Sequence, residues 1–201
     1  MVYFSEELRS SLNLVAHEMS EVSNERGYRV SVALELDEAF IGSGRSRSSL
    51  QRDLAVDGFM LGGSRAGLSP YKAGGGAYEF GAEILGSRMG VFRLRKARQL
   101  ADGSFRVVAN TASTWGDIDD DTLIVEIPFV FGYTMTEGHV GVVFVAEVTG
   151  VVIGNPGELI LGPITLLNAT PPTTGGFVPD EDEGLPGMED DDDDIVDSDA
   201  A

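Results

Sequence analysis

Closely spaced carboxylates at Asp117, Asp119 and Asp121 are the residues whose spacing best suits a chemical site. Carboxylates at alternate positions of a short loop can converge on one hard cation such as Ca²⁺. The pattern departs from an EF-hand loop, because Thr122 stands where that loop needs glycine and Pro128 stands where it needs glutamate. We therefore expect either an acidic turn before a strand or a less regular Ca²⁺ or Mg²⁺ site.

Other kinds of catalytic or cofactor site have little support in the sequence. The chain has no cysteine and two histidines, His17 and His139, which excludes thiolate chemistry and the familiar zinc spacings. The glycines of 62–67 and 74–76 do not match a phosphate-binding motif, and Ser64 lies one place too early for a nucleophile elbow. The sequence therefore predicts a protein that is not an enzyme and has no cofactor.

Acidic residues are concentrated at the C-terminal end. The formal charge is −19, and residues 180–201 contribute twelve acidic residues and no basic one. Such a segment repels itself and has few apolar groups to bury, so we expect a disordered acidic tail. Residues 170–179, rich in threonine, proline and glycine, are expected to link it to the folded part.

Charge also limits the choice of partners. An acidic surface disfavours duplex DNA and anionic membranes, because both bind through lysine and arginine. Twelve of the fourteen basic residues are arginine, which fits either adaptation to high salt or a GC-rich genome. No secretory signal or membrane span is evident, so the expected location is the cytoplasm, or the virion if the protein is viral.

The segment Ser5–Arg26 has the pattern of an amphipathic helix. Ser5 is a suitable N-cap, and Gly27 is expected to end the helix. Apolar residues repeat at spacings of four and three: Leu8, Leu12, Val15, Met19 and Val22. This stripe needs a partner surface, either the chain's own sheet or a neighbouring subunit.

After residue 27 the sequence favours strands and flexible loops, and residues 28–169 are expected to form one β domain. Alternating apolar residues predict a strand over 28–37, and glycine and serine predict loops over 41–49 and 62–76. Further strands are predicted over 77–85, 91–100, 105–110, 123–133, 140–153 and 159–168, with a hairpin turn at 101–103. Pro128 predicts an edge or a bulge in its strand.

No helical pattern separates these strands, which favours antiparallel pairing. The expected fold is therefore mainly β: an antiparallel sandwich, jelly roll or barrel with one N-terminal helix over residues 1–27 and an acidic tail.

Arginines at 93, 95 and 98 form the strongest positive cluster. Arg93 and Arg95 share one face of a strand. They form either a solvated sheet face or, together with Arg45, Arg47 and Arg52, a surface that receives carboxylates from an acidic tail of the same or a neighbouring chain.

In its organisation the chain resembles structural proteins of tailed viruses, of the decoration, turret, tail-tube or tail-completion type. The shared features are a small cysteine-free β body, glycine-rich loops, an amphipathic helix and a charged end; no diagnostic motif is shared. The resemblance implies a virion component that forms homo-oligomers and contacts other structural subunits. The alternatives are a β-sandwich module that binds a ligand or partner and, less well supported, a cupin-like enzyme.

Overall fold

A computed structural model describes residues 4–86, 88–109, 126–136, 138–152, 154 and 157–167. These residues belong to one compact unit, Met1–Pro171. The expected linker and acidic tail, and the carboxylates Asp117, Asp119 and Asp121, lie outside the described residues.

The first helix, α1 (Glu6–Glu35), is longer than its sequence pattern predicts. The Ser5 side chain accepts a hydrogen bond from the Leu8 N–H, as expected of an N-cap. The strand predicted over 28–37 is wrong, because α1 continues through this segment and buries Val30 and Leu34, four residues apart. The alternation of apolar residues that suggested a strand combines two different faces of this helix.

Gly27 does not end α1, which continues to Glu35. A Cβ atom at this position would lie 3.4 Å from the ring of His139, at the start of strand β6 (His139–Val152). This is an ordinary van der Waals distance, so the helix passes next to the strand with room for a small side chain.

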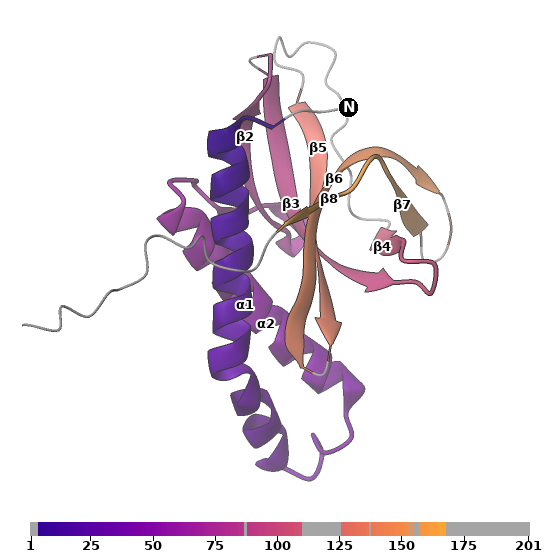
Figure 1. The fold of residues 1–201 in the computed structure, drawn as a ribbon. Coiled ribbons are helices and arrows are strands. Elements are labelled where there is room, and N and C mark those ends of the chain that lie inside the picture. Colours follow the sequence, from indigo (N-terminus) through magenta and orange to yellow (C-terminus); the bar gives the residue numbers. More distant parts are fainter. Residues whose placement is uncertain are drawn as a thin grey trace, which may run out of the picture. The chain divides into compact units, whose positions relative to one another are not determined.

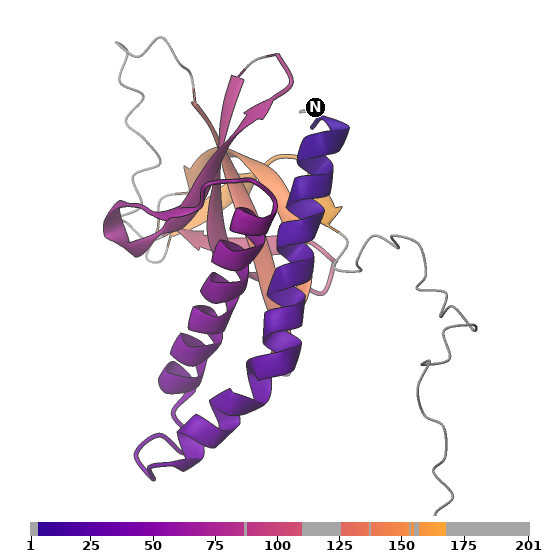
Figure 2. The ribbon, with the colours of Figure 1, turned by 90° about the vertical axis from the view of Figure 1, so that its left-hand side faces the viewer.

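A second helix, α2 (Gly44–Arg65), replaces most of the first predicted loop and the start of the second, so the expectation of one helix is wrong. The Ser43 side chain caps it by accepting a hydrogen bond from the Ser46 N–H at 3.2 Å. Figures 1 and 2 show α1 and α2 side by side against one face of the sheet, with the hairpin they form reaching beyond the strands.

Glycines of α2 bring the two helix backbones into contact. A Cβ atom at Gly58 would lie 2.6 Å from the Met19 Cα atom, and one at Gly62 would lie 2.8 Å from the Val15 Cα atom. Both distances are too short for any side chain. The glycine content of α2 therefore serves close helix packing, although it is also typical of a loop.

The sheet consists, in the described residues, of eight strands. Their bounds are β1 (Tyr71–Lys72), β2 (Tyr78–Ile84), β3 (Arg88–Gln99), β4 (Phe105–Ala109), β5 (Glu126–Thr136), β6 (His139–Val152), β7 (Gly157–Leu161) and β8 (Thr165–Leu167). The predicted strand 159–168 is therefore two strands. A short 3₁₀ helix, η1 (Gly74–Gly76), lies between β1 and β2.

Most strand pairs are antiparallel, as expected, but β3 and β5 pair in parallel from Met89↔Glu126 to Lys96↔Tyr133. The long strands β3 and β6 each take part in three ladders: β3 pairs with β2, β4 and β5, and β6 pairs with β5, β7 and β8. The parts of β3 and β6 that pair with β5 belong to the main sheet. The C-terminal end of β3 pairs with β4, and the C-terminal end of β6 pairs with β7. The pairings β3–β4–β7–β6–β5–β3 thus return to their starting strand.

Pro128 lies where β5 has a partner on one side. It pairs with Val91 of β3, and the pairs between β5 and β6 begin one residue later, at Phe129↔Glu147. The missing N–H of proline is therefore tolerated at this position. The hairpin turn predicted over 101–103 is confirmed: Gly103 has a positive φ of 84°, which glycine adopts without strain.

Two hydrophobic cores lie on opposite faces of the main sheet. The first joins both helices to β2, β3, β5, β6 and β8, and the second joins the other face to β4 and β7. Phe80, Phe92 and Phe129 form a row across β2, β3 and β5, with ring centroids 5.1 and 4.8 Å apart. Phe59 of α2 stacks on Phe80 at 5.3 Å and so attaches the helix to this row.

Alanine at Gly58 is expected to destabilise the protein by roughly 1–3 kcal/mol, because a new methyl group would push α2 away from α1. The measurement is the free energy of unfolding in urea. Gly44→Ala is the matched control, since a Cβ there meets nothing within 4 Å. It should be neutral or stabilising by up to about 1 kcal/mol. Equal effects of the two substitutions would contradict the backbone contact.

Candidate functional site

The apolar stripe predicted to contact a sheet or a neighbour lies inside the chain's own core. Leu12, Val15 and Met19 are 0% exposed, and Leu8 and Val22 are also buried. The first four belong to the first hydrophobic core, between α2 and the sheet. Val22 continues the same buried stripe along α1. These residues pack the fold and leave no surface for another copy.

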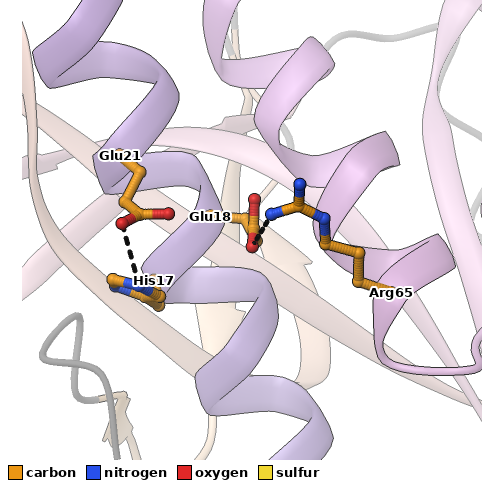
Figure 3. A network of polar contacts seen from close by, with 4 residues as sticks. All are labelled: His17, Glu18, Glu21 and Arg65. Atoms are coloured by element: carbon orange, nitrogen blue, oxygen red, sulfur yellow. Dashed lines mark hydrogen bonds and ion pairs between the residues drawn. The ribbon is translucent and has the colours of Figure 1, made fainter. Parts of the chain in front are cut away.

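Polar groups also join the helices (Figure 3). The buried carboxylate of Glu18 in α1 accepts a hydrogen bond from Arg65 at the end of α2. This bond raises the pKa of Arg65 above its usual value. The His17 side chain points to the other side of α1, where its Nε2 atom lies 3.2 Å from Glu21 Oε1. We assign the Glu18–Arg65 pair a structural role, because it joins the two helices close to their backbone contact.

Metal-binding groups do not gather in the described residues, where no set of three histidine, aspartate or glutamate residues is placed to hold a metal ion. The two histidines lie in α1 and at the first residue of β6. The weak metal candidates Asp117, Asp119 and Asp121 lie in 110–125, outside these residues, and stay a prediction.

The predicted arginine cluster is divided by the structure. Arg93 Nε donates to Glu79 Oε2 at 2.7 Å, and the other oxygen, Oε1, accepts from the Tyr71 hydroxyl at 2.9 Å. Arg95 follows on the same face of β3. Arg98 lies further along the strand, exposed, where its neighbour across the ladder is Arg106 of β4.

Arg95 is a half-buried cation in a positive environment. Burial lowers the pKa of Arg95 from its usual value, and the charges of Arg93 and Arg52 lower it further. Of the described residues, Glu79 is the one carboxylate that acts in the opposite direction. The structure thus places Arg52 of α2, which the sequence analysis had grouped with the cluster, near Arg95, adds Glu79 of β2 and separates Arg98 from the site.

An apolar surface that the sequence did not reveal lies at the tip of the helical hairpin, which we define as residues 28–47. Tyr28, Val32 and Leu36 are 60%, 52% and 81% exposed and follow one another every four residues along the end of α1. Phe40 and Ile41, in the turn to α2, are exposed as well. Such a group of large exposed apolar side chains is typical of a contact surface.

No family model, curated protein or solved structure matches this chain. Among the described residues, no helix has the combination of length and apolar character that is needed to cross a membrane.

Phenylalanine in place of Tyr133 is expected to raise the pH at which the protein unfolds in alkali. Burial raises the pKa of Tyr133 to about 12. The stabilisation from the neutral phenol is complete below about pH 10, the usual tyrosine pKa, and is lost as the pH rises towards 12. The loss is on the order of 2–3 kcal/mol. Circular dichroism against pH measures it. Tyr28→Phe, at an exposed position, is the control, and an unchanged alkaline midpoint in Tyr133→Phe would contradict this account.

Glutamine in place of Glu79 should destabilise the fold by about 3 kcal/mol, because it removes the partly buried carboxylate that accepts hydrogen bonds from Arg93 and from the Tyr71 hydroxyl. The control is Glu158→Gln, which removes a more exposed pair with Arg106 and should cost about 0–1 kcal/mol. Urea unfolding measures both. A Glu79→Gln effect no larger than that of the control would show that the charge of Glu79 is not needed.

Proposed function

We propose that this chain is a non-enzymatic structural protein that self-associates through the tip of its helical hairpin. The observation that carries the proposal is the exposed stripe Tyr28, Val32 and Leu36, which ends in Phe40 and Ile41. The apolar stripe at the start of α1 is used inside the fold, whereas this later stripe of the same helix is exposed and free to make a contact.

Charge supports a second copy as the partner. The tip carries equal numbers of exposed acidic and basic residues, namely Glu35, Asp37, Glu38, Arg29, Arg45 and Arg47. Its net charge is therefore zero in a chain whose formal charge is −19. Two copies therefore meet here without a net charge repulsion, and mixed charges around an apolar centre suit a contact in which one patch faces itself.

A component of a tailed-virus particle is the setting that we favour for such a protein. The support is the organisation of the sequence: a small body without cysteine and a highly charged end. Buried apolar area would hold the subunits together, as in other stable protein contacts.

The alternative is a module that binds a ligand or partner and remains a monomer. The positive environment of Arg95 favours this alternative, because a half-buried cation next to two others suits an anionic ligand. The two functions differ in one measurable property, the mass of the protein in solution.

Glutamate at both Val32 and Leu36 should convert oligomers to monomers, because it places charges in the centre of the contact. Sedimentation at micromolar protein concentration measures the mass. Leu85→Glu is the control, since Leu85 is 53% exposed and lies in the β2–β3 turn, away from the tip. A native chain that is already monomeric, or a variant that keeps the oligomer, would refute self-association through the tip.

A further inference from the structure

The connection between α1 and α2, residues 36–43, is close to a helix in its sequence. Leu36, Glu38 and Ala39 are good helix formers. Leu36 keeps helical backbone angles, with φ −67° and ψ −23°, and the last turn of α1 has no basic residue. Asp37 stands where a glycine commonly ends a helix. Helix α1 therefore has no strong stop signal at this end.

Two hydrogen bonds of the connection already have a helical spacing. The Phe40 N–H donates to the Asp37 carbonyl at 2.9 Å, and the Ile41 N–H donates to the Glu38 carbonyl at 3.2 Å. Bonds between residues three apart are those of a 3₁₀ helix. The chain then turns at Gly42, whose φ of 81° is costly for a residue with a side chain. The closed turn thus depends on this glycine.

Phe40 would face another helix if α1 continued through this connection. A helix has 3.6 residues per turn, so residues 18 apart, about five turns, lie on the same side. Phe40 follows buried Val22 by this spacing and precedes Gly58 by the same spacing. Gly58 faces Met19 across the contact between the helices. In a continuous helix Phe40 therefore lies on the contact side, whereas in the turn it is 45% exposed.

The register of the helix contact leads to the same residue. The contacts at Gly58 and Gly62, with Met19 and Val15, run antiparallel in one register. Continued along two such helices from different copies, this register has its midpoint at residues 38–39. Phe40 would lie at this crossing next to Phe40 of the second copy.

The other contacts of α1 can be made equally well by a second copy. Arg65 of α2 donates to Glu18, and the Ser23 hydroxyl accepts from the Val140 N–H at 2.8 Å. If α1 packs on the body of another copy, these contacts and those of the glycines of α2 form again between the two chains. The closed and exchanged forms then differ mainly in residues 36–43.

We infer that two copies of this chain associate by exchanging α1. In each copy the connection straightens into a helix, and α1 packs on α2 and the sheet of the other copy. Exchange of an identical element is a low-cost route to a dimer, because its contacts already exist within the single chain. This inference rests on the self-association proposed above and specifies its form.

The test uses the ion pair between Arg26 of α1 and Asp57 of α2, whose side chains are partly exposed. The chain has no cysteine, so Arg26→Cys and Asp57→Cys can be joined by a short bismaleimide without competing sites. The double variant is refolded from urea at micromolar concentration, so that both forms equilibrate, and sedimentation gives its native mass. A denaturing gel then shows whether the link lies within or between chains. The single variants control for chance links.

We expect a native dimer whose links join two chains, so that the denatured mass is doubled. A dimer whose links stay within each chain would overturn the exchange and leave the contact through the tip in place. A native monomer would refute both proposals.

Alanine at Gly42 should raise the ratio of dimer to monomer by roughly tenfold or more, because the closed turn then holds a side chain at positive φ and the straightened helix does not. A Cβ there meets nothing within 4 Å. Gly67→Ala is the matched control, since its φ is 73°, its surroundings are equally open and its conformation is the same in both forms. It should lower the free energy of unfolding and leave the ratio unchanged. Equal effects of the two substitutions on the ratio, or no effect at Gly42, would overturn the inference.

Discussion

Direct contact between the backbones of α1 and α2 is the constraint on which the rest of the structure depends. At Gly58 and Gly62 the helices are too close for any side chain. This approach allows Phe59 to stack on Phe80, at one end of the aromatic row, and allows Glu18 to meet Arg65. The first half of α1 and the second half of α2 are thus fixed on the sheet. The other halves of both helices extend past the strands and carry the apolar tip (Figure 2).

Part of this architecture could be predicted from the sequence. The start of α1, the turn at Gly103 and most strands follow from capping, glycine conformation and alternation, which are local properties. The end of α1 could not be predicted, because Tyr28, Val32 and Leu36 alternate with Val30 and Leu34 as strand residues do. Here tertiary packing decides, since Val30 and Leu34 are buried on one side of a helix and the other three residues are exposed. The composition of α2 is that of a loop, and its glycines have a purpose only when α1 lies against them.

The arginine site shows the same division between local and tertiary information. Alternation along β3 was enough to place Arg93 and Arg95 on one face. It could not bring in Glu79, which comes from a different strand, or show that Arg52 of α2 lies near Arg95 while Arg98 lies further along β3. The apolar stripe of α1 was recognised as a packing surface, but only the position of α2 and the sheet shows that the chain itself covers it. The contact surface proposed here is consequently the distal end of the same helix.

The most direct test of assembly through the tip is disulfide formation by a single introduced cysteine. Ser31 is exposed between Tyr28 and Val32, and the chain has no other cysteine to compete. Our account predicts that Ser31→Cys, oxidised at micromolar concentration, forms covalent dimers much faster than Ser104→Cys in the β3–β4 turn. Equal and slow cross-linking at the two positions would contradict it.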